Sequence, residues 1–506
     1  MIQPNANRPS KPYAGRKIHF IGAGGCGMAG LAEFVLMEGG QVSGSDMKAS
    51  AATERLVGLG ARIHIGHAPA NLPPGTDLVV YSAAVKPENP ERAEAERRGI
   101  PALKYAQFLG RLMTLRQGIA VSGTHGKSTT TSMVSYILTR AGLDPSFVIG
   151  AEVPQLGGGS HVGRGPHLVV EACEYDRSFL NYSPCAAAVL NVEEDHLDYY
   201  RDLREIRRAF GDFASRLAPD GLLVINARDL GRRGIERQAK CTVEEFGIGG
   251  RSDWHAENLE SDRGRFAFDV YRRGEFYVSV KLALAGRHHV LNALAATALC
   301  TWAGAPRETA AEALGTFTGA LRRMEILGEA GGVTVVDDYA HHPTEIAATL
   351  KAVRERFEPK RLWVVFQPHQ HSRTRFFLKD FARALTVADK IVVPDIYFVR
   401  DSEKERQAVR SQDLVAEIQA LGADALHIEE FDSIRRYLVE SLGAGDVLMT
   451  MGAGDVWRLA APILADLGGR PVNGCHGLLA TRVSDTGADS KSTAGQAGRG
   501  TRRKPR

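Results

Sequence analysis

The feature that most constrains the fold is a glycine-rich run that also holds a lysine and three hydroxyl side chains, Gly123-Thr124-His125-Gly126-Lys127-Ser128-Thr129. It follows the apolar stretch GIAVS and precedes the helix-like stretch TTSMVSYILTRAG, so we expect strand, phosphate loop and helix in that order. Such a loop offers backbone N–H groups to phosphate oxygens, its lysine neutralises the terminal phosphates, and its serine reaches magnesium. Two residues rather than four separate the glycines, so the loop is a shortened variant. ATP and Mg²⁺ are the expected ligands.

Length and composition indicate a large α/β protein. The chain has 506 residues, which suggests about three domains, and 44% hydrophobic and 24% charged residues are ordinary for a globular chain. A net charge of +4 indicates no nucleic-acid-binding face. The first residues lack the apolar segment of a signal peptide, and no run is long enough to cross a bilayer, so we expect a cytoplasmic protein that does not bind membranes. Six dispersed cysteines without a CxxC pair indicate reduced thiols.

Apolar runs that alternate with amphipathic segments predict stacked βαβ units in three blocks. Strands are expected near residues 18–21, 41–44 and 78–82, then 167–171 and 186–191, and finally in VTVVDD, RLWVVF, KIVVPD and DVLMTMG. We expect a flexible start at residues 1–15, a Rossmann-like domain at 16–117 and a central nucleotide-binding domain at 118–323. Another α/β domain is expected at 324–477 and a disordered basic tail at 478–506. Oligomeric state stays open, with a monomer–dimer equilibrium among the outcomes.

A second glycine turn follows the strand expected at residues 18–21. It has the GxGxxG spacing, with Gly22, Gly24, Gly25 and Gly27, and Asp46 follows the next strand. This pattern suits the diphosphate of a nucleotide, and alone it would also suggest a dinucleotide dehydrogenase. A turn that serves only strand-to-helix packing is the other explanation.

Acidic and imidazole side chains follow two strands of the central block. Glu171 ends the strand in HLVVEACEYD, and His196 lies in NVEEDHLDYY. Magnesium prefers oxygen ligands, so Glu171 is a credible ligand whereas spacing alone leaves His196 open. The adjacent histidines of DDYAHHP, His341 and His342, indicate a polar active-site loop rather than a closed zinc site.

These segments, in this order, resemble the Mur ligase family. The resemblance spans about residues 16–475 and rests on eight motifs: GAGGCGMAGLAEF, GTHGKST, EACEYDRSFL, NVEEDHLDYY, GRHHVLNALAA, RRMEILG, DDYAHHPTE and QPHQHSRTR. It implies a three-domain architecture with a Rossmann-like N-terminal domain for a UDP-sugar, a central P-loop ATPase domain and a Rossmann-like C-terminal domain for an amino acid. It also implies an ATP-dependent carboxylate–amine ligase of peptidoglycan synthesis. The members it resembles most join L-alanine to the lactyl carboxylate of UDP-N-acetylmuramate through an acyl phosphate.

The resemblance also implies roles for individual residues. Lys127 contacts the ATP phosphates, while Ser128, Glu171 and His196 hold magnesium. The resemblance implies that ATP also contacts Asn292, Arg323 and Asp338. The UDP-sugar would contact the glycine turn with Asp46, His67 and Ser82, and the amino acid would contact Tyr339, His342 and Arg373. A guanidinium fork at Arg373 suits a planar carboxylate.

The chain departs from the family pattern at three places. His289 stands where a second asparagine is usual, Ala340 replaces the glycine of YGHHP, and Gln370 replaces an arginine found in many relatives. An imidazole at 289 keeps the capacity for one hydrogen bond. Rival functions are a ligase that attaches a preformed murein tripeptide, a non-catalytic nucleotide-binding regulator on the same scaffold, and an NAD-dependent dehydrogenase. The complete set Lys127, Ser128, Glu171 and His196 argues against the last two.

Overall fold

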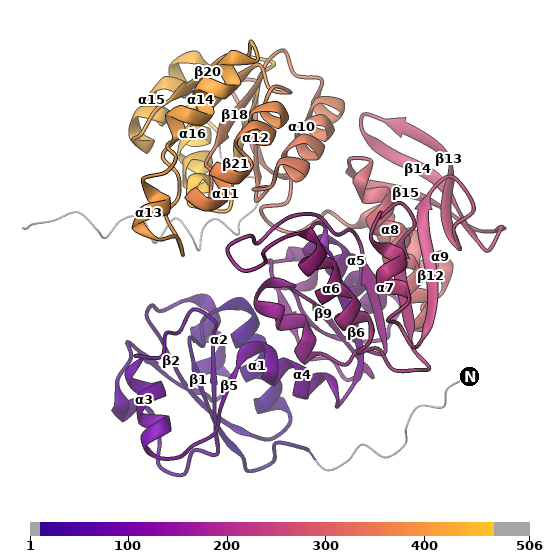
Figure 1. Cartoon of the computed structure of the whole chain (residues 1–506), viewed down its shortest axis with the longest axis vertical. Helices are drawn as coiled ribbons and strands as arrows, with labels where there is room; N and C mark the ends of the chain where they lie inside the picture. The colour runs from indigo at the N-terminus through magenta and orange to yellow at the C-terminus, as the bar shows by residue number, and fades with distance from the viewer. Residues whose placement is uncertain (1–10, 470–506) are drawn as a thin grey trace, which may run out of the picture.

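The computed structural model describes residues 11–469, whose strands form three separate sheets that follow one another along the chain. Figure 1 shows them as an indigo N-terminal unit, a magenta middle unit and an orange C-terminal unit. The tail expected from residue 478 lies outside the described residues, as do residues 1–10. Within residues 11–469, no helix is both long and apolar enough to span a membrane.

The N-terminal sheet has five strands in the order β3-β2-β1-β4-β5, all of them parallel. This is the doubly wound arrangement that alternating apolar runs and amphipathic helices predict, so the Rossmann-like expectation is confirmed. The strands are β1 Lys17–Ile21, β2 Gln41–Asp46, β3 Arg62–Ile65, β4 Leu78–Tyr81 and β5 Ala102–Lys104. The helices are α1 Cys26–Met37, α2 Ala51–Gly58, α3 Pro90–Arg97 and α4 Tyr105–Met113.

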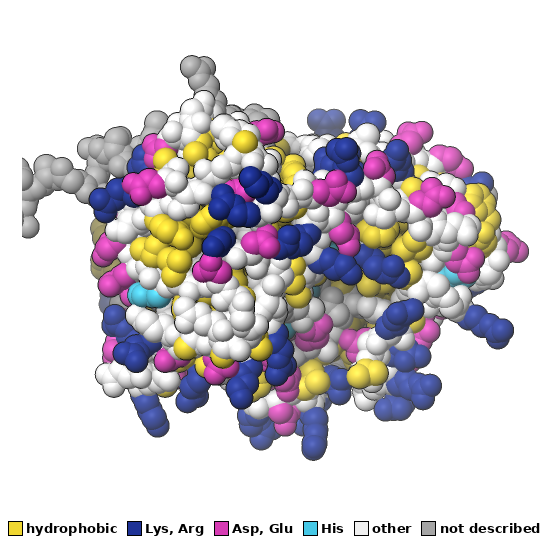
Figure 2. All heavy atoms as spheres, turned by 90° about the horizontal axis from the view of Figure 1, so that it is seen from above, with side chains coloured by type: hydrophobic (Ala, Val, Ile, Leu, Met, Phe, Trp, Pro, Cys, Tyr) yellow, Lys and Arg dark blue, Asp and Glu magenta, His cyan; other side chains and the backbone are white. Residues whose placement is uncertain are grey.

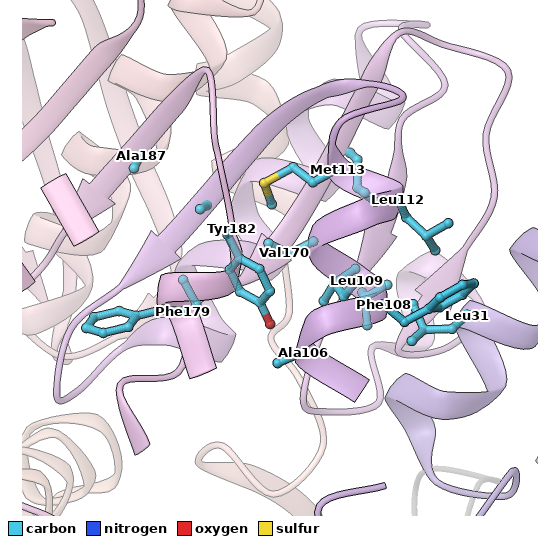
Figure 3. Packing of buried hydrophobic residues seen from close by; sticks show 14 of the residues in the cluster. Leu31, Ala106, Phe108, Leu109, Leu112, Met113, Val170, Phe179, Tyr182 and Ala187 are labelled. Atoms are coloured by element: carbon cyan, nitrogen blue, oxygen red, sulfur yellow. The ribbon is translucent and has the colours of Figure 1, made fainter. Parts of the chain in front are cut away.

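Helix α4 joins the N-terminal unit to the middle unit through one continuous apolar core. Phe108, on one face of the helix, packs with Leu31 of α1 (Figure 3). Met113, at its end, and Tyr182 and Phe179 of the middle unit belong to the same cluster. Since all five side chains are almost fully buried, the hydrophobic effect favours a fixed placement of the two units.

The middle sheet has ten strands in the order β15-β14-β13-β12-β11-β10-β6-β9-β7-β8. Their bounds are β6 Gln117–Ser122, β7 Ser146–Val148, β8 Ser160–His161, β9 His167–Glu171, β10 Ala186–Val189, β11 Leu222–Asn226, β12 Thr242–Ile248, β13 Trp254–Asp262, β14 Arg265–Arg272 and β15 Glu275–Ala285. The helices are α5 Lys127–Arg140, α6 Leu203–Ala214, α7 Arg232–Glu236, α8 His288–Trp302 and α9 Arg307–Thr316. Strands β9, β6 and β10 are parallel neighbours, so the segments that follow them emerge at one edge of the sheet.

The C-terminal sheet has six strands in the order β16-β17-β21-β18-β19-β20, with only the β16–β17 pair antiparallel. The strands are β16 Glu325–Ala330, β17 Val333–Asp338, β18 Leu362–Phe366, β19 Lys390–Val393, β20 Ala425–His427 and β21 Val447–Met451. The helices are α10 Pro343–Phe357, α11 His371–Phe376, α12 Leu378–Leu385, α13 Glu403–Arg406, α14 Ser411–Ala420, α15 Phe431–Ser441 and α16 Ala460–Asp466. Short 3₁₀ helices complete the chain: η1 Pro69–Asn71, η2 Pro154–Leu156, η3 Tyr175–Asn181 and η4 Val456–Leu459.

The surface seen from above carries acidic and basic side chains side by side over much of its area (Figure 2). Both signs occur in similar numbers in the whole sequence, with 63 Lys and Arg residues against 59 Asp and Glu residues. Such interspersion is typical of a solvated surface, and the features that position ligands lie in cavities instead.

Candidate active site

The glycine-rich loop after β6 lines a cavity of about 300 Å³ at the carboxyl edge of the middle sheet. Gly123 has a φ of 144° and Gly126, which precedes α5, a φ of 82°. A Cβ atom on Gly126 would lie 2.8 Å from the side-chain oxygen of Asn292. Glycine is therefore needed here for both conformation and space. The N-terminus of α5 faces this loop, which suits an anion such as a phosphate.

Lys127 is the first residue of α5, and its ammonium group is fully engaged. Its Nζ donates to the carbonyl oxygens of Gly123 at 2.6 Å and Thr124 at 3.0 Å. It also donates to both carboxylate oxygens of Glu174, at 3.1 and 3.0 Å. Burial opposes the charged form, but Glu174 outweighs burial and raises the pKa of Lys127 above its ordinary value. The lysine is a cation held inside the site.

The three residues expected to hold magnesium all line this cavity. Glu171 ends β9, and its Oε1 accepts the N–H of Gly150 at 2.8 Å. Ser128 follows Lys127 in α5, and the buried Nδ1 of His196 has no hydrogen-bond partner among the described residues. A hydroxyl, a carboxylate and an unsatisfied imidazole nitrogen around one cavity fit a magnesium site that keeps several waters.

The segment that links the middle and C-terminal units, together with the end of β17, closes the cavity on its other side. Arg323 lies between α9 and β16, and its Nη2 is 3.5 Å from Ser128 Oγ, while its guanidinium lies 5.0 Å from the Tyr339 ring centroid. Asp338 accepts the N–H groups of Met324 and Ala340, both at 2.6 Å. The carboxylate of Asp338 thus braces the segment that carries Arg323. Burial raises the pKa of Asp338 to about 7, against the opposing effect of Arg323.

A second cavity lies beside the first and shares Gly126, Thr129, Arg323 and Glu345 with it. Leu190, Phe246 and Leu291 supply part of its apolar wall. The Asn292 amide is 3.3 Å from Nδ1 of His289. Burial and the neighbouring His288 hold the pKa of His289 well below its ordinary range, so this imidazole is neutral and accepts that hydrogen bond. An apolar slot with an amide and a neutral imidazole suits a nucleobase.

His125 of the phosphate loop connects the middle and C-terminal units. Its Nδ1 lies 3.2 Å from Glu345 of α10, and its Nε2 lies 3.4 Å from Glu193, in the loop after β10. Burial lowers the pKa of His125, but the two carboxylates outweigh burial and raise it to about 9. Thr344 adds a second link, since its hydroxyl donates to Glu193 at 2.6 Å.

The potential metal ligands of His125, Glu193 and His342 lie within 4.8 Å of one another. Both ring nitrogens of His342 are already used, because Nδ1 accepts the N–H of Thr344 and Nε2 then donates to the carbonyl of Glu194. A cationic His125 and a fully bonded His342 lack free lone pairs, so this group fits an ion-paired contact between units rather than a metal site.

The residues expected to bind the amino acid do not all reach the main cavity. Tyr339 and Arg373 line it, whereas His342 lines a separate pocket between the start of α10 and α12. The fork of Arg373 is bonded to Asp195, with Nε at 3.2 Å and Nη2 at 2.9 Å from Oδ1. Its Nη1 lies 3.2 Å from His369 Nδ1 on the cavity wall. Arg373 is therefore placed by Asp195, and its role toward a substrate stays a prediction.

Two departures from the family pattern are buried beside these residues. Ala340 donates its N–H to Asp338, and it is 1% exposed. Gln370 has a φ of 69° where α11 begins, and its amide nitrogen is buried without a hydrogen-bond partner among the described residues.

The glycine turn of the N-terminal unit opens into a pocket of its own. Five of the residues expected to bind a UDP-sugar line this pocket: Gly22, Gly25, Asp46, His67 and Ser82. Gly24 donates its N–H to Asp46 at 2.8 Å, so the acidic side chain holds the turn. Gly27 has a packing role, because a Cβ there would lie 2.6 Å from the Tyr105 hydroxyl.

Several residues around the cavity were not predicted, and the clearest are Glu174, Asp195 and Glu345. Glu174 lies three positions after Glu171 in the same acidic run, and Asp195 immediately precedes His196. Their position beside predicted ligands was a signal, but it did not reveal that they pair with Lys127, Arg373 and His125.

Comparison with protein-family models matches three consecutive stretches of the chain. Residues 17–117 match the catalytic domain of the Mur ligase family, residues 121–300 the Mur ligase middle domain, and residues 322–454 the Mur ligase, glutamate ligase domain.

Curated relatives match nearly end to end. The UDP-N-acetylmuramate–L-alanine ligases of Caldanaerobacter subterraneus and Alkaliphilus metalliredigens are 43% and 44% identical over 89% of this chain and 98% and 97% of their own lengths. Among solved structures, a UDP-N-acetylmuramate–alanine ligase from Thermotoga maritima is 29% identical with a TM-score of 0.74, over 89% of this chain and 98% of that one. A murein peptide ligase from Psychrobacter arcticus is 26% identical with a TM-score of 0.66, and the match covers 90% of this chain and 99% of that one.

Proposed function

This chain belongs to the Mur ligase family, and we propose that it joins L-alanine to the lactyl carboxylate of UDP-N-acetylmuramate at the expense of ATP. The products are UDP-N-acetylmuramoyl-L-alanine, ADP and phosphate, in the cytoplasm, where ATP is available. The observation that carries the proposal is the convergence of Lys127, Glu171 and His196 with Arg323 and Arg373 around one cavity.

ATP supplies the phosphoryl group that turns the lactyl carboxylate into an acyl phosphate open to attack by the alanine amine, and Mg²⁺ offsets the phosphate charge. Lys127 would bind the terminal phosphates, and Ser128, Glu171 and His196 would hold the metal. Asn292 and the neutral His289 would receive the adenine in the adjoining cavity. Positioning and charge stabilisation by these fixed groups supply much of the expected rate.

Closure of the C-terminal unit on the middle unit would keep water from the acyl phosphate. We propose domain ranges of 16–117, 118–323 and 324–477, with the hinge beside Arg323. The contacts of His125 with Glu345 and of Arg373 with Asp195 support a closed arrangement, because each joins one unit to the other. The glycine-turn pocket, with Asp46, His67 and Ser82, would hold the UDP moiety.

A product assay tests the proposal. The full-length protein is incubated with ATP, magnesium and UDP-N-acetylmuramate, and L-alanine, glycine, L-serine and the murein tripeptide are offered separately. We expect the mass of the alanyl product with L-alanine, weaker formation of the glycyl and seryl products, and rejection of the tripeptide. A comparable kcat/KM for the tripeptide would contradict the alanine assignment, and absence of any product would contradict ligation.

A further inference from the structure

All three N–H donors of the Lys127 ammonium group are already used in hydrogen bonds in this structure. This group has three N–H donors and four oxygen acceptors within 3.1 Å, two from loop carbonyls and two from Glu174. The proposed function requires this ammonium group to contact an ATP phosphate. At least one of the present hydrogen bonds must therefore be given up when ATP binds.

Glu174 is the strongest competitor for the lysine. It is the charged partner, and a bond between two charged groups is roughly twice as strong as one to a neutral carbonyl. The loop carbonyls of Gly123 and Thr124 belong to the phosphate loop itself, whereas Glu174 comes from the segment after β9. Replacing the contact with Glu174 by a contact with a phosphate therefore changes the surroundings of Lys127 more than losing a hydrogen bond to a loop carbonyl would.

Glu174 cannot follow the lysine or turn to solvent. It is 2% exposed and is not among the residues that line the cavity of about 300 Å³ beside the phosphate loop. Its carbonyl accepts the Tyr200 hydroxyl at 2.6 Å and the N–H of Arg177 at 3.0 Å, so its backbone is fixed on two sides. His196 Nε2 lies 3.8 Å from Oε1 and is a second nitrogen that could face the carboxylate.

We propose that Glu174 is the positioning residue of the phosphate loop. It holds Lys127 in a retracted place between turnovers, yields it to the ATP phosphates, and takes it back as ADP and phosphate leave. The inference rests on the proposed function, since it assumes that ATP is the ligand of this loop. A buried carboxylate that loses its counter-charge is costly, so Glu174 lowers the affinity for nucleotide and favours product release.

The test measures binding of the non-hydrolysable analogue AMPPNP, with magnesium, to the full chain by calorimetry. Glu174→Gln keeps the shape and the acceptor oxygen but removes the charge. We expect this variant to bind AMPPNP more tightly by roughly 5- to 150-fold, the range for one charge-assisted hydrogen bond. The KM for ATP should fall by a similar factor, while the KM values for UDP-N-acetylmuramate and alanine stay within about twofold.

Glu244→Gln is the matched control. Glu244 is also a buried glutamate of the middle unit, and it accepts from Trp254 Nε1 at 2.6 Å and from Arg273 at 2.9 Å, but it lines none of the cavities described above. Its replacement should leave the affinity for AMPPNP unchanged. If Glu174 were merely structural, its variant would bind nucleotide more weakly or equally, and all three KM values would rise; either outcome overturns the proposal.

The Lys127→Met background separates competition for the lysine from simple repulsion of phosphate. With the ammonium group absent, Glu174→Gln should no longer tighten AMPPNP binding; tightening that persists overturns the proposal. Glu174→Asp, which withdraws the carboxylate by one methylene, serves if the glutamine variant fails to fold, and it should also tighten binding. A wild-type protein that binds no AMPPNP would refute the proposed function itself, whereas normal wild-type binding without tightening in the variants refutes only the role of Glu174.

Discussion

Replacement of Arg373 by lysine should raise the KM for L-alanine far more than the KM for ATP. The arginine places Nε and Nη2 on Asp195 and keeps Nη1 on the cavity side, 3.2 Å from His369. A lysine has one ammonium group at the end of a flexible chain, so it cannot pair with Asp195 through a fork and also present a donor to a substrate carboxylate. Its charge is kept, which makes the substitution a test of geometry.

The expected size of the effect is that of a single charge-assisted hydrogen bond to the alanine carboxylate. Such a bond is worth about 1 to 3 kcal/mol, which corresponds to a rise of roughly 5- to 150-fold in the KM for alanine. Steady-state kinetics should vary alanine, ATP and UDP-N-acetylmuramate in turn. The KM values for ATP and for the UDP-sugar should change by no more than about twofold.

Arg361→Lys is the matched control, because Arg361 forms a two-bond pair with the buried Asp446 in the same unit and lies outside the cavity. It should leave all three KM values unchanged. Equal rises of all three KM values in Arg373→Lys would refute the reasoning. Arg373 would then serve the contact between the units through Asp195 rather than the substrate.

Three further outcomes are expected. Lys127→Ala and Glu171→Ala should each reduce turnover by at least about a hundredfold yet leave UDP-sugar binding, measured by calorimetry, within about twofold, because the two pockets lie in different units; near-normal ligation by Lys127→Ala would contradict the ATP site. Truncation after residue 477 should leave kcat unchanged in steady-state assays, and a large loss would contradict an idle tail. Glu91 is fully buried, and although burial opposes its charge, hydrogen bonds from His19, Ser45 and Asn71 lower its pKa to about 2. Since the unfolded pKa is near 4.3, this stabilisation is present above about pH 5 and is lost as the pH falls toward 2. Glu91→Gln should therefore lower the free energy of unfolding at neutral pH by about 1 to 3 kcal/mol, which thermal unfolding would show as a lower midpoint. The difference in midpoint between the variant and the wild type should narrow in acid, and a difference independent of pH would contradict the assignment.

Local pattern was enough to predict the strands that position the site. The expected strand VTVVDD is β17, Val333–Asp338, and the expected strand at residues 167–171 is β9. Each is a short apolar run that ends in an acidic residue at the carboxyl edge of a sheet, and both the burial and the turn chemistry are encoded within a few residues. Parallel pairing then brings the ends of β9, β6 and β10 together without further information.

Partner choice among charged side chains was not predictable from such patterns. Arg373 and Asp195 are 178 positions apart, and Lys127 and Glu174 are 47 apart. The acidic runs EACEYD and NVEEDH each offer several carboxylates, and spacing does not decide which one faces a cation. The choice depends on how three units pack, and that packing depends on buried surfaces such as the one around α4. Strands β13 to β15, an antiparallel extension of the middle sheet, carry hairpin signals in their own sequence but have no bearing on these ion pairs.

The loop after β10 explains why roles assigned one residue at a time are hard to separate here. Glu193 accepts from Thr344, the carbonyl of Glu194 accepts from His342, and Asp195 pairs with Arg373, so three consecutive residues contact the C-terminal unit. The next residue, His196, faces the cavity beside Glu171 instead. His196, on the metal side of the site, and Asp195, on the amino-acid side, therefore belong to one short segment. A backbone shift of one of these residues moves the other. A substitution that frees this segment from the C-terminal unit should therefore disturb the nucleotide side as well, even when the altered side chain contacts no phosphate.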